Sequence, residues 1–279
     1  FSYEQLFRPR AFTSAGIQLD AMLILMNYWS LSLDVEFTPW GEDDYFEPRT
    51  HDMSMFYHRP PSVEIGFRGD TDKSKRFYIE GNAGYMKAWS DYGEHGYMWS
   101  VQPEFKASRR FSFDYSIGVE KMFNDIGFVI DHPTEGITFG KRDLTTVTNT
   151  VSGAFIFSSS SYLTLRGRHY WSRADYDGGY MILQPDGSLL DRIFSTPVNN
   201  NDVNTNFLNI DMVYTWRFAP GSELSLVWKN AIWSEGDVII SNGFDNFTDL
   251  LSNPQTNSIS LKVLYYLDYQ NFRKLFKAK

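Results

Sequence analysis

The sequence contains no cysteine among its 279 residues, which excludes disulfides, thiolate metal sites and thiol nucleophiles. Cations are also scarce, because 26 Lys and Arg stand against 34 Asp and Glu and leave a net charge of -8. Nucleic acid is bound by clustered cations, so no nucleic-acid partner is expected. No cofactor is expected either.

Long apolar runs are missing too. The most apolar stretch, 21–33, is interrupted by Asn27 and Ser30, whereas a membrane-spanning helix needs about 20 mostly apolar residues. No signal peptide opens the chain, and Phe1 is not a natural start. We therefore expect mature or truncated material without a transmembrane helix.

What the sequence does contain is aromatic side chains in a period of two. Phe, Tyr and Trp make up 17% of residues, although the mean hydropathy is only -0.37. In the segment 28–38, Trp29, Leu31, Leu33, Val35 and Phe37 alternate with Ser30, Ser32, Asp34, Glu36 and Thr38. Such alternation predicts strands with one apolar and one polar face.

The same pattern recurs along the whole chain and predicts about eleven strands. They are expected at 14–26, 28–40, 61–69, 76–89, 96–107, 111–123, 144–157, 161–173, 206–219, 222–234 and 258–269. Most are longer than the five or six residues usual in soluble proteins, and they match the roughly 9–11 residues of a tilted membrane strand. The fold predicted is all-β, an antiparallel transmembrane β-barrel of the outer-membrane type. A soluble sandwich with the Trp residues in its core is the alternative.

The connections between these strands alternate in length. Short ones are expected at 27–28, 69–75, 108–110, 158–160 and 219–221, and long ones at 41–60, 90–95, 124–143, 174–205 and 235–257. Outer-membrane barrels have short periplasmic turns and long external loops, so the C-terminus is predicted to be periplasmic. With eleven strands and a periplasmic C-terminus, the first strand would begin outside the membrane. Bacterial single-chain barrels normally have an even number of strands with both ends in the periplasm. We therefore expect the C-terminal part of a larger barrel, with a lead-in at 1–13, the barrel at 14–269 and a basic periplasmic tail at 270–279.

Two sets of side chains follow from this register. Aromatic side chains near strand ends are expected at the membrane interfaces, namely Trp29, Trp40, Trp89, Trp99, Trp171, Trp216, Trp233, Tyr265 and Tyr269. Charged side chains of the polar face are candidates to line a lumen, namely Asp34, Glu36, Glu80, Asp114, Glu120, Arg166, Arg168, Asp211 and Arg217. These charges either surround water or form a packed ionic interior.

Catalytic and metal-binding patterns are sparse. His51, His95 and His132 each stand beside an acidic residue, but adjacent residues of an extended chain point to opposite faces, so solvated loop histidines are the simpler interpretation. No catalytic residue is assigned, and no glycine-flanked serine elbow is present. Asp175, Asp177 and Asp186 are the only calcium candidates, with a polar external loop as the alternative.

The C-terminal third carries a family resemblance. The run Trp216-Arg217-Phe218-Ala219-Pro220-Gly221-Ser222 resembles the late hairpin of a Bacteroidota outer-membrane barrel domain of unknown function, number 5916. Tyr28-Trp29, Arg142-Asp143-Leu144 and Tyr265-Tyr266-Leu267 are further matches. Members of that family carry a domain similar to family 9 carbohydrate-binding modules ahead of the barrel, so the resemblance implies a missing front half. It implies no established active site.

Three functions remain open. The first is a non-enzymatic anchor or subunit of a larger, glycan-handling envelope assembly, with outer-membrane lipid, lipopolysaccharide and protein partners. The second is a diffusion channel, motivated by the charged face. The third is an outer-membrane hydrolase, motivated only by the acidic neighbours of the histidines.

Overall fold

The structure is a computed structural model that describes residues 1–132, 136–192 and 201–267. It is all-β, a single sheet of 15 antiparallel strands with one short helix. The elements are β1 (Ser2–Leu6), β2 (Ala11–Ile24), β3 (Ser30–Thr38), β4 (Glu42–Asp44), β5 (Tyr57–Arg59), β6 (Ser62–Asp70), β7 (Phe77–Ala88), β8 (His95–Lys106), β9 (Phe111–His132), β10 (Gly136–Ser158), β11 (Ser161–Leu183), β12 (Leu189–Arg192), β13 (Val203–Ala219), β14 (Ser222–Gly236), α1 (Gly243–Leu251) and β15 (Gln255–Leu264).

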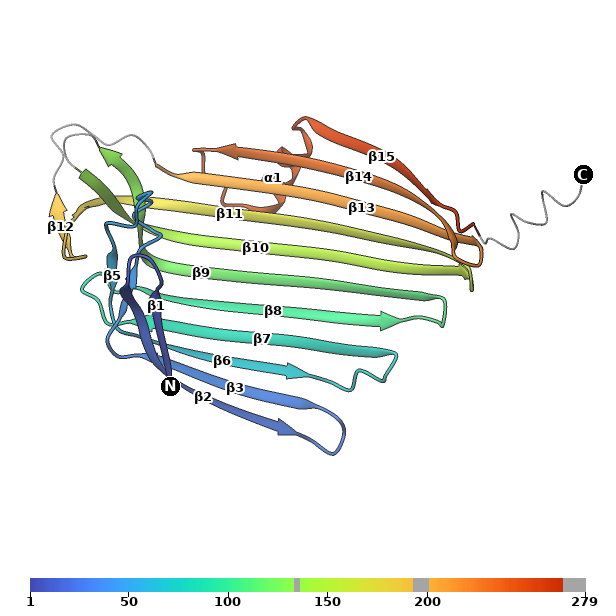
Figure 1. Cartoon of the computed structure of the whole chain (residues 1–279), viewed down its shortest axis with the longest axis horizontal. Helices are drawn as coiled ribbons and strands as arrows, with labels where there is room; N and C mark the ends of the chain where they lie inside the picture. The colour runs from blue at the N-terminus through green and yellow to red at the C-terminus, as the bar shows by residue number, and fades with distance from the viewer. Residues whose placement is uncertain (133–135, 193–200, 268–279) are drawn as a thin grey trace, which may run out of the picture.

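All eleven predicted strands are confirmed. They are β2, β3, β6, β7, β8, β9, β10, β11, β13, β14 and β15, and each lies beside its neighbour in chain order. Figure 1 shows the short turns gathered at one end of the sheet and the long connections at the other. We call these the short-turn end and the long-loop end. The predicted alternation of short and long connections is thus present in the fold.

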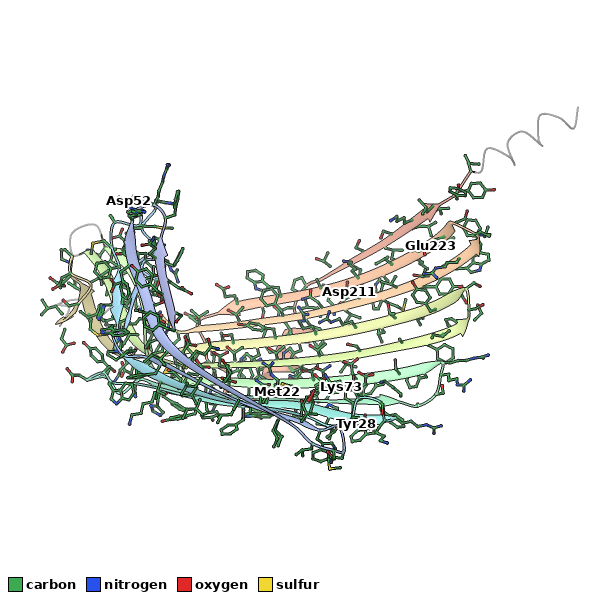
Figure 2. All side chains as sticks on the ribbon, turned by 60° about the horizontal axis from the view of Figure 1, so that its bottom comes forward. Met22, Tyr28, Asp52, Lys73, Asp211 and Glu223 are labelled. Carbon is green, nitrogen blue, oxygen red and sulfur yellow. The ribbon has the colours of Figure 1, made fainter. Side chains whose placement is uncertain are left out.

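The sheet is curved and open (Figure 2). Within the described residues, β15 pairs only with β14, and Ile17–Ile24 of β2 pair only with β3. Both edge strands, β2 and β15, run from the long-loop end toward the short-turn end. The described part of the chain therefore does not close on itself, and direct pairing of its two edges would be parallel.

Two of the predicted loops are partly wrong. The ranges 124–143 and 174–205 were expected to be irregular, but β9, β10 and β11 extend through much of both. The cause is a pair of register shifts, one beside Asn124, whose φ is 54°, and one opposite Gly140. A bulge interrupts the period of two while the backbone pairing continues beyond it.

Two further loops are more ordered than predicted. The range 41–60 contains the β4–β5 hairpin, and the range 235–257 contains α1. The helix begins after Asn242, whose side chain accepts a hydrogen bond from the Phe244 N–H, as an N-cap residue does. No helix in the described ranges is long and apolar enough to cross a membrane.

The predicted lead-in, 1–13, holds β1, which pairs antiparallel with the start of β2 and leads directly into it. The predicted tail, 270–279, and the interface residue Tyr269 lie outside the described residues.

Candidate functional site: the polar face and its cap

The nine predicted lumen residues share one face of the sheet. Asp34 lies opposite Gly66, Glu36 opposite Glu64, and Asp211 opposite both Arg166 and Lys229. Following the register from strand to strand places the whole set on this face, which comprises Asp34, Glu36, Glu80, Asp114, Glu120, Arg166, Arg168, Asp211 and Arg217. Residues two apart on a strand point to the same side, so the alternation predicted this grouping correctly.

The opposite face is apolar across the sheet. One row of register partners reads Leu33, Phe67, Ala83, Trp99, Val119, Val147 and Trp171. Many large apolar side chains of this face are exposed, including Leu19, Phe67 and Ile259 at 66%, 58% and 75%. A monomer in water rarely leaves such a contiguous apolar area uncovered.

Charge is segregated on the polar face. Acidic side chains dominate from β2 to β9, where they are Asp20, Asp34, Glu36, Glu64, Asp70, Glu80, Glu104, Asp114 and Glu120. Basic side chains dominate from β11 to β15, where they are Arg166, Arg168, Arg217, Lys229 and Lys262. The stretch 144–158 of β10 has no charged residue and lies between the two groups, with Thr146, Thr148, Thr150 and Ser152 on this face.

Ion pairs on this face are local. Lys73 contacts Asp70 at 3.3 Å and Glu80 at 2.5 Å, and Lys229 lies 3.5 Å from Asp211. Among the described residues, no ion pair joins the acidic half to the basic half. The polar face therefore presents an excess of negative charge over β2–β9 and an excess of positive charge over β11–β15 to whatever lies in front of it.

A folded loop covers the polar side at the long-loop end. We call residues 42–59 the cap; they comprise β4, β5 and the loop between them. Glu42 pairs with Ser14 of β2, while the His58 N–H donates to the Gly187 carbonyl beyond β11, at 2.9 Å. The cap thus bridges strands that are far apart in the sheet (Figure 2, near Asp52).

The cap is held by a small core. Tyr57 is 3% exposed and packs with Ile126, Phe139, Met181 and Leu183 at the long-loop ends of β9, β10 and β11. Its ring centroid lies 5.3 Å from that of Phe139. Burial of these side chains stabilises the cap by roughly 1.5–3 kcal/mol for each.

Arg142 links the cap to the sheet. It continues the polar face of β10, and its guanidinium contacts Asp125 at 2.8 Å, the Tyr176 hydroxyl at 2.9 Å and Glu47 of the cap at 3.5 Å. Glu47 also accepts a hydrogen bond from the Phe128 N–H at 2.9 Å. A second pair, Arg59 with Asp44 at 3.0 Å, lies within the cap.

Two carboxyl groups in and near the cap have pKa values shifted in opposite directions. Burial alone would raise the pKa of Asp44, but N–H donors from Glu47 and Phe46 and the charge of Arg59 outweigh it and hold the pKa below its usual range. Burial raises the pKa of Glu94, and the neighbouring charge of Asp125 raises it further. Glu94 Oε2 is buried and has no hydrogen-bond partner among the described residues.

Substitution Glu94→Gln should therefore stabilise the cap at neutral pH. A carboxyl group whose pKa is raised by folding contributes stability below its unfolded pKa, and that contribution is lost as the pH rises through the folded pKa. We expect the temperature at which protease cuts the cap to rise by about 2–4 °C at pH 8 and to be unchanged at pH 4. The exposed residue Glu4 offers the control, Glu4→Gln. An equal effect of Glu94→Gln at both pH values would contradict this account.

The predicted interface aromatics fall into two groups. Trp29, Trp216 and Tyr265 lie at the short-turn end, and Trp40 and Trp89 at the long-loop end. These five are between 44% and 64% exposed, and Trp99, on the apolar face of β8, is 38% exposed. Trp171 differs because it is only 7% exposed and donates its indole N–H to Asn204 at 2.7 Å. Trp233 differs because it lies opposite Phe207, in the register of the polar face.

The histidine and aspartate candidates are dispersed. His95 bonds the Gly93 carbonyl, while Asp52 bonds Ser54. The Asp–His contact that forms is one the sequence did not reveal, between His58 Nδ1 and Asp43 at 2.6 Å within the cap. No serine hydroxyl hydrogen-bonds this imidazole within the described residues.

Nor do the calcium candidates converge. Asp177 contacts Lys141 at 2.6 Å, and Asp186 bonds Ser188 in its own turn. No group of three or more Asp, Glu or His suited to a metal ion occurs in the described part of the chain.

Sequence patterns missed a polar cluster on the apolar face. Asn204, Asn206 and Asn246 are buried, and Asn246 of α1 exchanges hydrogen bonds with Asn206 at 2.7 and 2.8 Å and accepts one from Asn204 at 3.0 Å. Phe247 contacts the His169 ring edge-on, with centroids 5.0 Å apart. α1 therefore shields amides that would otherwise interrupt the apolar face.

Replacing Asn246 by Leu should release α1. The change removes the acceptor of the buried side-chain NH2 groups of Asn204 and Asn206, at a cost of about 1–3 kcal/mol for each unsatisfied group. We expect faster hydrogen exchange over 243–251, measured by mass spectrometry. Thr248→Ala, at an exposed position of the same helix whose hydroxyl bonds only to Asp245 O, should leave the exchange unchanged. Unchanged protection in Asn246→Leu would refute the anchoring role.

Comparison with known proteins identifies a family. The family model described as Domain of unknown function (DUF5916) matches residues 1–276. No curated protein matches the chain.

Proposed function

The chain belongs to the DUF5916 family, and from its two-faced sheet we propose that it is the membrane-embedded portion of an outer-membrane β-barrel. The apolar face lies against lipid and the polar face lines the interior. The long-loop end is external and the C-terminus periplasmic. The barrel acts without catalysis as the anchor or subunit of a larger envelope assembly.

The single observation that carries this proposal is the contrast between the two faces over the middle of the long strands. Away from the long-loop end, apolar side chains of the eleven long strands share one side, and the charged side chains of these strands share the other. Lipid-facing apolar residues that alternate with polar lumen residues are characteristic of outer-membrane barrels. Burial of so much apolar surface in lipid removes it from water at roughly 25 cal/mol per Å².

The open edges support a larger barrel. Unpaired backbone groups in lipid cost several kcal/mol each, so a sheet edge does not persist there. Because β2 and β15 run in the same direction, antiparallel closure needs an odd number of further strands. β1 lies on the edge of β2 away from β3, where Ser2 pairs with Gly16, and we infer that the first further strand lies along the same edge. A strand that continues this register backward along Ile17–Ile24 would pair with the free edge of β2.

The cap favours an anchoring role rather than an open pore, because it lies across the polar side at the long-loop end. A diffusion channel is the second candidate, favoured by the two opposed fields of charge, because rings of charge set ion preference in pores. A family 9 carbohydrate-binding-like partner domain, as in the Bacteroidota proteins that the sequence resembles, would give the assembly its glycan-handling role.

The test is purification from native outer membranes in mild detergent, followed by intact mass measurement and planar-bilayer recording. The anchoring proposal predicts fractionation with the outer membrane, stoichiometric companions or a longer polypeptide, and no steady conductance. A chain that arrives alone at 32.4 kDa and conducts ions would overturn the anchor in favour of the channel. Failure to fractionate with membranes would overturn the barrel itself.

A further inference from the structure

Three cations lie on the apolar face near the long-loop end. Lys121 on β9 and Arg173 on β11 flank Thr145 of β10 in one register row, and Lys87 lies one row further out, opposite His95. The Arg173 guanidinium lies over the Trp171 ring at 5.7 Å from its centroid. Two strand spacings separate Lys121 from Arg173, which is about 10 Å.

Among the described residues, no carboxylate lies within ion-pair distance of these cations, although Asp143 and Asp175 face each other in the next row outward. Elsewhere at this end, Lys141 pairs with Asp177 and Arg142 with Asp125. Among the described residues, however, no ion pair includes Lys87, Lys121 or Arg173. Unneutralised cations with an aromatic neighbour attract an anion at this position.

A groove lies next to the cationic row, on the side of the short-turn end. It has a volume of about 760 Å³ and runs between α1 and the apolar face of β9, β10, β11 and β13. Phe244, Phe247 and Leu251 of α1 form one wall, and Val151, Leu208 and Ile210 belong to the sheet. Gly167 leaves open space at the sheet side, because a Cβ there would meet nothing within 4 Å. The volume falls within the 300–1,000 Å³ of typical ligand pockets.

We propose that Lys121, Arg173 and the groove beneath α1 form a binding site for one lipopolysaccharide molecule. A lipid A phosphate lies between the two cations, and one acyl chain occupies the groove. The inference rests on the proposed membrane orientation, in which the long-loop end faces the external leaflet. It combines charge complementarity at the row with continuity between the groove and the lipid-facing surface, two features that an amphiphile with an anionic head requires.

The experiment titrates the detergent-purified, lipid-depleted chain with rough-type lipopolysaccharide and counts bound molecules by native mass spectrometry. Lys121→Gln with Arg173→Gln should weaken binding at least about tenfold, because charge-assisted contacts to phosphate are lost. Gly167→Leu should weaken it similarly by filling the groove. Arg166→Gln with Arg168→Gln removes the same charge from the other face of β11 and should leave binding unchanged.

Three results would overturn the site. They are equal affinity of the wild type and the Lys121/Arg173 double variant, equal affinity of the wild type and Gly167→Leu, or equal affinity for phosphatidylglycerol and lipopolysaccharide. Flotation with lipid vesicles distinguishes a failure of the proposed lipopolysaccharide site from a failure of the proposed function. A wild-type chain that floats but binds without selectivity overturns only the site, whereas one that does not float overturns the membrane orientation on which the site depends.

Discussion

Ile117→Arg should prevent stable insertion into the outer membrane, while Ser116→Arg should leave it intact. Ile117 lies on the apolar face of β9 between Val101 and Asn149, at a level far from both ends of the strand. Ser116, the preceding residue, lies on the polar face. An arginine on the lipid face near the bilayer midplane costs about 2–4 kcal/mol, whereas one on the polar face keeps its charge among polar groups.

The measurement is the fraction of each variant that floats with outer membranes and resists extraction by urea. Because the two positions are adjacent, strand propensity and local sequence are nearly identical, so a difference between them reports which face meets lipid. Equal loss in both variants would indicate general misfolding of β9. Loss confined to Ser116→Arg would reverse the assignment of the faces.

Arg142→Met should detach the cap from the sheet. The substitution leaves Asp125 and Glu47 without their cation, and both side chains are largely buried. Removing one partner of a buried ion pair costs about 3–5 kcal/mol, because the remaining charge is uncompensated. We expect rapid proteolysis between residues 45 and 56, while the strands remain protected.

Arg76→Met removes an exposed arginine near the short-turn end and provides the control. Arg142→Lys keeps the charge and should restore part of the protection, since Lys lacks the planar fork that contacts several acceptors. A cap that resists protease equally in Arg142→Met and the wild type would show that the apolar contacts of Tyr57 suffice to hold it.

The sequence predicted the strands and their faces because the information is local. Alternation from Trp29 to Phe37 reports directly which side chains share a side, and the Ala219-Pro220-Gly221 run marks the β13–β14 turn by its backbone preferences, with φ of 72° at Gly221. The family resemblance at this hairpin is confirmed by the family match. Charge positions on the polar face follow from the same rule.

What sequence reasoning missed depends on contacts between distant residues. Glu47 meets Phe128 and Arg142 across more than 80 residues of chain, and Asn246 meets Asn206 across 40. Neither has a periodic signature, and both lie in segments that contain Gly, Asn and Asp and so look like loops. The bulge at Asn124 had a further effect, because it moved the following side chains to the other face and hid the continuation of β9.

The shared direction of the two edge strands limits how copies of this chain can associate. Copies that span one membrane in the same orientation present descending strands at both edges, since β2 and β15 each run from the long-loop end to the short-turn end. Any edge strand of one copy would pair in parallel with any edge strand of another copy. A dimer of this chain would therefore still have two edge strands that run in the same direction. Pairing between these described edges therefore cannot supply a strand that runs from the short-turn end to the long-loop end, which an antiparallel wall would need.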